Sequence, residues 1–321
     1  MSSLIEQAAL RLEQLRRAGA TVPDTKPQQR LPGGGHAATA PEPEPMPQAS
    51  TPAPLAVTSR RVDLDFTALA AANILTPNAS RSLLGDQFRV VKRPLLRNAM
   101  GKGAAKLANG NLIMVTSALA GEGKSFTAVN LAMSIATELD HTVMLVDADV
   151  ARPSVSRMLG LTAESGAGEG AGLLDVLDGR MDMASVLLKT NVEKLTILPS
   201  GTQHARATEL LASDAMTRLL DEMGRRYADR IIIFDSPPLL LTTEARVLAT
   251  HMGQVVVVVQ AERTLQADVQ SALATIESCP VRMLLLNQAQ ANAEGGYGYG
   301  YGYGYGHGSA PDTSLLEAPT T

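Results

Sequence analysis

The stretch of the chain that most constrains its fold is residues 111–136, NLIMVTSALAGEGKSFTAVNLAMSIA. It predicts a buried strand over Leu112–Val115, a loop of small residues, and an apolar-faced helix that begins near Lys124. The loop ends in GEGKS at residues 121–125, which is typical of a phosphate-binding loop. In such a loop the backbone N–H groups surround the phosphates, the lysine contacts the β and γ oxygens, and the serine hydroxyl binds Mg²⁺. The N-terminus of the following helix adds a partial positive charge.

The strict loop pattern G-x-x-x-x-G-K-[ST] is missed at one place, because Ala118 stands where the first glycine is expected. A GKS tripeptide alone occurs often by chance, but its place between an apolar strand and an apolar-faced helix is much rarer. Nucleotide binding is therefore a better interpretation than a chance glycine turn. The candidate cofactor-binding residues are Gly121, Glu122, Gly123, Lys124, Ser125 and Phe126.

The chain alternates strands and helices from Leu112 onward, which is typical of a parallel sheet covered by helices on both faces. The expected strands are near-continuous apolar runs, as in strands buried on both faces. They are Leu112–Val115, Val143–Val146, Leu195–Leu198, Ile231–Phe234, Val255–Val259 and Met283–Leu286. The expected helices in this region are Lys124–Glu138, Ser154–Leu159, Gly172–Leu177, Ala207–Arg226, Glu244–Ala249 and Leu265–Glu277. The predicted fold class is α/β, a P-loop NTPase with a mostly parallel sheet.

Two of the expected strands end in carboxylates. Asp147 and Asp149 follow Val143–Val146, and Asp235 follows Ile231–Phe234. Ligands bind beyond the carboxyl ends of the strands in an open α/β sheet, so we expect the three carboxylates at the same edge as the phosphate loop. They would repel one another without a cation, and Mg²⁺ bridging the β and γ phosphates would remove that conflict. One strand-end aspartate often only caps the next helix, but three beside GEGKS favour a site.

Composition limits the other classes of function. The chain has 321 residues, a formal net charge of -4 and a pI near 5.8, which does not favour nucleic acid as a partner. Its one cysteine, Cys279, excludes an internal disulfide and a cysteine-based metal cluster. No apolar run approaches the roughly 18 residues of a membrane span, and the start does not resemble a secretory signal. We expect a cytoplasmic protein, recruited to the inner membrane by a partner.

Four parts are expected along the chain. Residues 1–18 form an amphipathic helix with Leu4, Leu12 and Leu15 on one face, which either packs on its own domain or docks a partner. Residues 19–60 are rich in Pro, Ala and Gly and predict a disordered linker. Residues 61–290 form the P-loop domain, and residues 291–321 a disordered tail.

The tail holds five of the six tyrosines of the chain, each followed by a glycine. Glycine at every second position disfavours a stable helix or packed strand. One interpretation is a low-complexity segment kept for weak association. Another interpretation is a flexible set of phosphoacceptors, and it becomes the better one if the same chain carries a kinase-like site; each phosphate would add roughly -1.5 to -2 charges. The candidate acceptors are Tyr297, Tyr299, Tyr301, Tyr303 and Tyr305.

Three motifs carry a family resemblance. ALAGEGKS, VMLVDADVARP and IIIFDSPP match the Walker A, Walker A′ and Walker B motifs, and residues 80–290 resemble the bacterial tyrosine kinases of capsule and exopolysaccharide assembly (BY-kinases). The segment LTILPSGTQHARATELL and the tyrosine tail belong to the same resemblance. The stretches SLIEQAALRLEQLRRA and ATELLASDAM look like the exosortase-associated branch of that family.

The resemblance implies an ATP- and Mg²⁺-dependent protein-tyrosine autokinase that phosphorylates its tail in trans and regulates exopolysaccharide polymerisation and export. It makes Lys124, Asp147, Asp149 and Asp235 the candidate catalytic residues. Among them, Asp149 is the candidate base for a tyrosine hydroxyl, whose ordinary pKa is near 10. Ser125, Asp147 and Asp235 are the candidate metal ligands.

The resemblance also implies partners. These are further copies of the chain in a homo-oligomer, with a ring as one arrangement, a membrane chain-length-determinant (Wzz-like) activator, and a tyrosine phosphatase. The family's interface motif E-x-x-R-x-x-R corresponds to Asp86, Arg89 and Lys92, although lysine lacks the bidentate fork of arginine. In the Walker A′ motif, Ala151 stands where the family usually has arginine, and Arg152 follows it.

Two alternatives stay open. MinD/ParA-like partition ATPases share the fold, but they carry a signature lysine where this chain has Leu119. A tyrosine repeat also has no use in the function of such an ATPase. The other alternative is a nucleotide-gated oligomeric interaction module without kinase activity.

Overall fold

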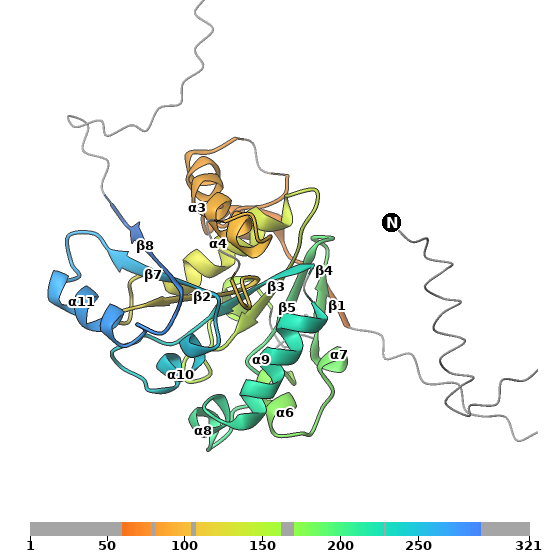
Figure 1. Ribbon diagram of the computed structural model, residues 1–321. Coiled ribbons are helices and arrows are strands. Elements are labelled where there is room, and N and C mark those ends of the chain that lie inside the picture. Colours follow the sequence, from red (N-terminus) through yellow and green to blue (C-terminus); the bar gives the residue numbers. More distant parts are fainter. Residues whose placement is uncertain (1–59, 79–80, 104–106, 162–169, 228, 290–321) are drawn as a thin grey trace, which may run out of the picture. The chain divides into compact units, whose positions relative to one another are not determined.

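The computed structural model describes residues 60–78, 81–103, 107–161, 170–227 and 229–289 (Figure 1). The predicted N-terminal helix, nearly all of the predicted linker and the tyrosine tail lie outside these residues. The described strands are β1 (Arg60–Val62), β2 (Leu112–Ser117), β3 (Thr142–Asp147), β4 (Leu188–Thr190), β5 (Leu195–Leu198), β6 (Arg230–Asp235), β7 (Gln254–Gln260) and β8 (Val281–Asn287).

The eight strands form one sheet in the order β1-β4-β5-β3-β6-β2-β7-β8. All neighbouring pairs run parallel except β4 and β5, which are antiparallel. The mostly parallel sheet predicted from the sequence is therefore confirmed, with all six expected strands in it. The strands β1 and β4 are not predicted from the sequence, because three residues are too few to show a hydrophobic pattern.

Helices cover both faces of the sheet (Figure 1). They are α2 (Phe66–Ala71), α3 (Leu83–Ala99), α4 (Lys124–Ala136), α5 (Val155–Met158), α6 (Leu173–Leu177), α7 (Met183–Val186), α8 (Ala207–Leu211), α9 (Asp214–Arg226), α10 (Glu244–Thr250) and α11 (Gln266–Ala274). One hydrophobic core lies between the sheet and α3 and α4, and a second lies between the other face and α6, α9, α10 and α11. Burial of β2, β3 and β6 on both faces explains why these strands are continuously apolar.

The predicted helix Ala207–Arg226 is wrong as a single element. It divides into α8 and α9, because Ser213 begins a new helix: its hydroxyl accepts a hydrogen bond from the Met216 N–H and donates one to the Leu210 carbonyl.

The strand β6 lies between β3 and β2, so the strands that carry the three nucleotide motifs are direct neighbours. Asp147 at the end of β3 is in register with Asp235 at the end of β6, and Asp235 is in register with Val115 of β2. The sheet therefore brings both strand-end aspartates to the edge from which the phosphate loop departs.

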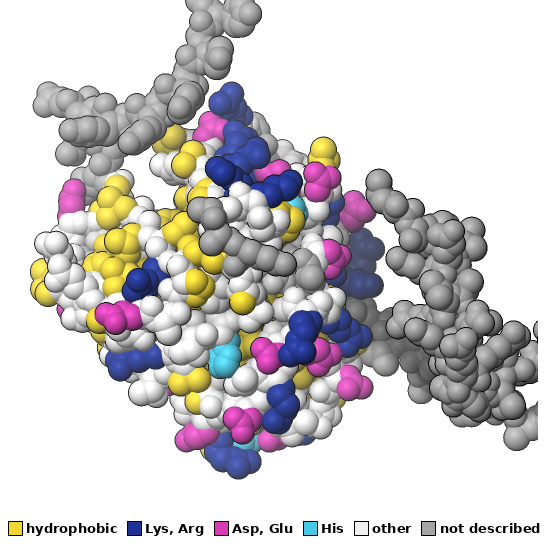
Figure 2. Space-filling model, in the orientation of Figure 1, with side chains coloured by type: hydrophobic (Ala, Val, Ile, Leu, Met, Phe, Trp, Pro, Cys, Tyr) yellow, Lys and Arg dark blue, Asp and Glu magenta, His cyan; other side chains and the backbone are white. Residues whose placement is uncertain are grey.

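The last strand of the sheet, β8, pairs with β7 alone among the described strands. Leu284 and Leu286 are exposed on it, and Figure 2 shows hydrophobic side chains gathered on the part of the surface where β8 lies in Figure 1. None of the described helices is both long and apolar enough to cross a membrane.

Candidate active site

The phosphate loop joins β2 to α4 through two glycines in the left-handed region, Gly121 with φ 89° and Gly123 with φ 93°. Side chains other than glycine rarely adopt this conformation. Gly123 is also the residue before the first turn of α4, and a Cβ there would collide with the side-chain amide of Asn287. The backbone conformation therefore favours glycine at position 123, and a larger residue would also displace the Asn287 side chain.

Ala118, the departure from the strict motif, is accommodated in the fold. Its backbone is not left-handed, its methyl group is buried in the second core, and its carbonyl accepts a hydrogen bond from the Leu240 N–H at 3.2 Å. The loop therefore does not need glycine at this position. Leu119, where partition ATPases place their lysine, packs against the same core.

Lys124, the first residue of α4, forms an ion pair with Asp149 of the loop after β3. The Lys124 Nζ lies 2.5 Å from Asp149 Oδ2 and 3.4 Å from the Ser125 hydroxyl. The other Asp149 oxygen accepts a hydrogen bond from the Arg152 N–H at 3.2 Å, and the Arg152 side chain is exposed. The lysine of Walker A and the candidate base of Walker A′ are therefore in direct contact.

Asp147 and Asp235 are fully buried and only partly compensated. Asp147 Oδ2 accepts hydrogen bonds from the N–H groups of Ser154 and Val155, both at 3.0 Å, at the start of α5. Its other oxygen and both oxygens of Asp235 meet no donor of good hydrogen-bond geometry in the described part of the chain. Buried polar groups are normally paired, so three free oxygens at one edge of the sheet indicate a missing ligand.

Burial shifts both carboxyl groups toward the protonated form. It raises the pKa of Asp147 to about 8, helped by the negative charge of Asp235, while the two backbone hydrogen bonds oppose the shift. Burial also raises the pKa of Asp235 to about 6, and the Lys124 charge and the nearby Ser125 hydroxyl limit this rise. A cation beside these oxygens would favour the charged forms of both groups.

The donor set fits a hard cation such as Mg²⁺, which binds few protein oxygens and keeps water and phosphate ligands. Asp147, Asp235 and the Ser125 hydroxyl are the residues that would hold it. Asp149, the candidate base, is not among these residues, and its carboxylate is paired with Lys124. Among the described residues, no group of three or more His, Cys, Asp or Glu is arranged to bind a metal alone.

Two of the predicted cofactor-binding residues have side chains directed elsewhere. Phe126 packs against the core beside α3 and α4. Glu122 is buried, and its carboxylate bonds to the Leu119 N–H and the Thr264 hydroxyl. Thr264 and Asn287 are not predicted from the sequence, because they lie 142 and 165 positions after Glu122 and belong to no phosphate motif.

The predicted interface residues divide between the surface and the interior. Arg89 is exposed and forms an ion pair with Asp86 at 2.5 Å. Lys92 is buried instead, and its Nζ lies 2.7 Å from Glu138 Oε1 and 2.5 Å from the Ser134 carbonyl. An interface role stays a prediction for Asp86 and Arg89, whereas the Lys92 side chain is directed into its own chain.

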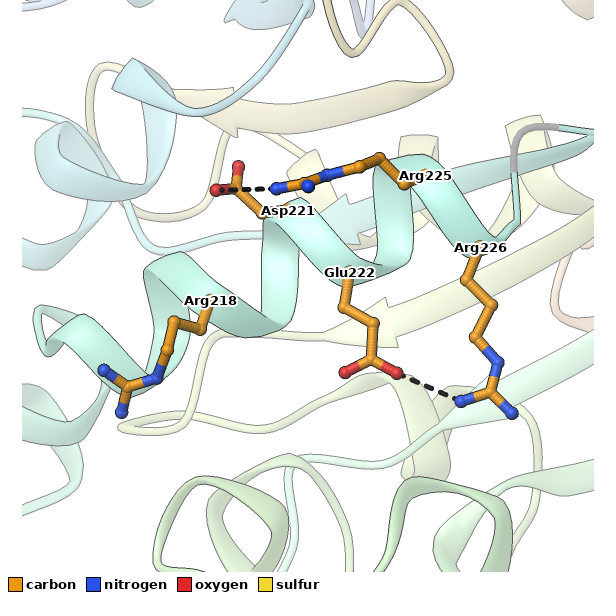
Figure 3. Close-up of a pocket in the computed structure, with 5 residues that line it drawn as sticks. All are labelled: Arg218, Asp221, Glu222, Arg225 and Arg226. Atoms are coloured by element: carbon orange, nitrogen blue, oxygen red, sulfur yellow. Dashed lines mark hydrogen bonds and ion pairs between the residues drawn. The ribbon is translucent and has the colours of Figure 1, made fainter. Parts of the chain in front are cut away.

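A shallow hollow on the outer side of α9 is lined by charged side chains (Figure 3). Arg225 pairs with Asp221 at 3.5 Å, and Arg226 pairs with Glu222 at 3.0 Å. The end of α9 leads into the start of β6, so the hollow lies toward the opposite edge of the sheet from the phosphate loop. These are local pairs along one helix, and the hollow is not part of the site.

A family model described as "ParA: NUBPL iron-transfer P-loop NTPase" matches residues 109–288, more than half of the chain. The chain therefore belongs to this family of P-loop NTPases. It is 31% identical over 173 residues to the tyrosine-protein kinase CpsD of Streptococcus agalactiae, a match that covers 54% of this chain and 72% of CpsD. This chain is a member of the bacterial tyrosine-protein kinase family.

Other members of this kinase family differ in how much of their length the chain spans. Tyrosine-protein kinase YwqD of Bacillus subtilis is 28% identical over 212 residues, which cover 66% of this chain and 83% of YwqD. Tyrosine-protein kinase ptk of Acinetobacter johnsonii is 31% identical over 189 residues, but these are 58% of this chain and only 25% of ptk.

The fold agrees with this membership. The kinase domain of the Escherichia coli tyrosine kinase ETK aligns with a TM-score of 0.55 and 23% identity, over 73% of this chain and 97% of that domain. The chimerical protein CapA2B2 gives a TM-score of 0.55 and 24% identity, over 71% of this chain and 93% of that one. Both alignments show a shared fold.

Proposed function

We propose that this chain is an ATP-dependent protein-tyrosine autokinase that phosphorylates its own tail tyrosines, Tyr297 to Tyr305, between copies of the chain. The observation that carries the proposal is the set of three uncompensated oxygens on Asp147 and Asp235 beside the Lys124–Asp149 pair. A cation and a nucleotide phosphate would compensate these groups together. The tail contains five tyrosines that could accept phosphate, and relatives of this chain are named tyrosine-protein kinases.

Lys124 exchanges partners in the proposed mechanism. Its ammonium group leaves Asp149 and contacts the β and γ phosphates, where it stabilises the charge that develops during transfer. The backbone N–H groups of residues 121–125 bind the phosphates at the start of α4. Ser125, Asp147 and Asp235 would hold Mg²⁺, which would supply charge neutralisation during the transfer.

Asp149, once released from Lys124, accepts the proton of the attacking tyrosine hydroxyl. A bond then forms between the tyrosine oxygen and the γ-phosphorus, and the bond from that phosphorus to the β,γ-bridging oxygen breaks. ADP leaves with the electron pair of that bond, and the proton rests on Asp149. The tyrosine hydroxyl needs such an acceptor because its ordinary pKa is near 10.

The biological setting is part of the proposal. Tail phosphorylation would regulate exopolysaccharide polymerisation and export, in a homo-oligomer that includes contacts through Asp86 and Arg89. A membrane chain-length-determinant (Wzz-like) protein would recruit the chain to the inner membrane and activate it, and a tyrosine phosphatase would reverse the reaction. The charge of several phosphotyrosines on one tail would drive the copies apart.

Mass spectrometry of the purified full chain after incubation with ATP and Mg²⁺ tests the proposal. Phosphate is expected within residues 297–305 of the wild type and absent in Lys124→Met. Replacing the five tail tyrosines by phenylalanine should remove most of the label, and Tyr227 serves as the internal control because it lies outside the tail. Full labelling of Tyr227 with none in the tail would refute the tail as substrate.

A ParA-like ATPase switch is the second candidate, because the matching family model is of the ParA type. It predicts ATP hydrolysis without phosphotyrosine, with or without a membrane partner. The same incubation, assayed in parallel for inorganic phosphate and for phosphotyrosine, separates the two functions.

A further inference from the structure

Glu122 is a buried carboxylate within the phosphate loop whose two oxygens are already bound by protein groups. It is 2% exposed. Its Oε2 accepts a hydrogen bond from the Leu119 N–H at 2.6 Å, three positions earlier in the same loop. Its Oε1 accepts one from the hydroxyl of Thr264, which lies between β7 and α11. The side chain is therefore directed away from the phosphates and into the protein.

Thr264 links the loop to the end of β7. Its oxygen accepts a hydrogen bond from the Gln260 N–H at 3.2 Å, while its proton goes to Glu122. A continuous path of hydrogen bonds thus runs from the last residue of β7, through Thr264 and Glu122, to the N–H of Leu119 at the start of the loop.

Asn287 at the end of β8 makes a second link. Its Nδ2 donates a hydrogen bond to the Glu122 carbonyl at 2.9 Å. Its own carbonyl accepts a hydrogen bond from the Ala261 N–H, also at 2.9 Å, just after β7. The backbone of residue 122 is therefore fixed from β8 while its side chain is fixed from β7.

Burial of a carboxylate without a cationic partner is costly, and none of the described ion pairs includes Glu122. The cost is offset only while both oxygens keep their hydrogen bonds. Such a group favours a single arrangement of the loop, because any movement of the loop breaks a bond to a buried charge. Loop N–H groups that are already in place bind phosphate without an ordering cost.

We propose that Glu122 and Thr264 are positioning residues that hold the empty phosphate loop in its nucleotide-binding shape by fastening it to the end of β7. This inference rests on the nucleotide site of the proposed function. Thr264 touches neither phosphate nor tyrosine in this role and acts only through Glu122. Loss of its hydroxyl leaves the loop free to move and lowers affinity for ATP and ADP alike.

Calorimetric titration of the purified full chain with a non-hydrolysable ATP analogue and Mg²⁺ tests the inference. Thr264→Val removes the hydroxyl at nearly constant volume and should weaken binding about tenfold, since it leaves a buried charged acceptor unpaired. Thr264→Ser keeps the hydroxyl and should bind within about twofold of the wild type. Thr275→Val is the matched control, because its hydroxyl only bonds to the Ala272 carbonyl at the end of α11, and its affinity should be unchanged.

A structural role alone would lower the melting temperature of Thr264→Val and leave the affinity of the folded fraction unchanged, which would overturn the inference. Equal weakening in Thr264→Ser would overturn it as well. In a double-mutant cycle, Glu122→Gln and Thr264→Val should be non-additive, and strict additivity would contradict the proposed link.

If Thr264→Val fails to fold, hydrogen exchange of the nucleotide-free wild-type protein tests the inference instead. The Leu119 amide should exchange slowly even without nucleotide, and rapid exchange there would refute the inference without any variant. A wild type that binds no nucleotide refutes the proposed function instead, and the exchange measurement still tests the Glu122–Thr264 link.

Discussion

Lys92 is buried and Lys124 is half-buried, and each pairs with a carboxylate, yet their surroundings differ. Lys92 joins α3 to the end of α4 through the Ser134 carbonyl and Glu138, away from the strand-end aspartates. Lys124 pairs with Asp149 beside the strand-end carboxylates, three oxygens of which lack donors in the described region. The first pair is complete within the chain, and the second lies in a site that needs a ligand. Buried carboxylate oxygens without a hydrogen-bond donor beside an ion pair therefore distinguish a binding site from a structural contact.

The largest expected effect comes from Lys124→Met. Tail phosphorylation should fall by at least about 100- to 1,000-fold, because a donor aimed at developing charge contributes that much. The melting temperature should fall as well, since the buried Asp149 loses its cationic partner. Quantitative phosphotyrosine analysis per folded molecule, with a thermal melt of the same sample, measures both. A folded variant that keeps its phosphotransfer activity would show that the Lys124–Asp149 pair is only structural, like the pair of Lys92.

Lys92→Met tests the structural pair, and we expect it to affect stability rather than activity. It should lower the free energy of unfolding by about 2–3 kcal/mol, less than a fully buried pair would lose, because Glu138 is partly exposed to water. The folded fraction should keep its phosphotransfer activity. Urea denaturation measures the first effect, and activity per folded molecule the second. Loss of activity without loss of stability would show that the Lys92 pair contributes to function.

Asp235→Asn should abolish transfer and stabilise the empty protein. The folded-state pKa of about 6 exceeds the ordinary value near 3.9, so the folded protein binds more protons than the unfolded one. The contribution of Asp235 to stability is therefore highest below about pH 4 and is lost as the pH rises toward 6. At pH 7 the variant should be more stable by about 3 kcal/mol. Melting curves from pH 4 to 8 check this, and a variant with an unchanged pH slope would contradict it.

The smallest effect is expected on the exposed surface of α9. Arg225→Ala removes the pair with Asp221, and stability should change by less than about 0.5 kcal/mol, because exposed pairs along a helix contribute little. Urea denaturation at low and high salt measures the change. A larger change, lost at high salt, would mean that the charges of α9 act as a network.

The sequence predicts the central strands of the sheet but not its shortest strands or every helix boundary. Apolar runs identify the six strands from β2 to β8 that the sequence predicts. Burial on both faces explains the unbroken pattern of β2, β3 and β6, whereas β8 at the edge exposes alternate residues. Because the predicted strands are parallel, their carboxyl ends also predict that Asp147 and Asp235 lie at the same edge of the sheet. Three-residue strands such as β1 carry no such pattern, and the division between α8 and α9 depends on one serine.

Side-chain partners within the site could not be predicted in the same way. Motif spacing places Lys124 and Asp149 at one edge but does not say that they touch. It also assigns Glu122 to the ligand, whereas its partner Thr264 comes from a distant loop that only the folded sheet brings near. Lys92 shows the same limit, since the family resemblance assigns it to an interface motif with Asp86 and Arg89, and the fold buries it.

The bond from Asn287 to the Glu122 carbonyl has a consequence for how the tail meets the active site. Tyr297 follows Asn287 by ten positions, so the first acceptor is tethered to the same sheet edge as its own phosphate loop. Within reach of such a short tether, the effective concentration is of the order of millimolar. The proposed phosphorylation between copies would therefore compete with a high local concentration of the chain's own tyrosines. Dilution of the protein separates the two routes, because an intramolecular rate is independent of concentration, whereas an intermolecular rate falls with it.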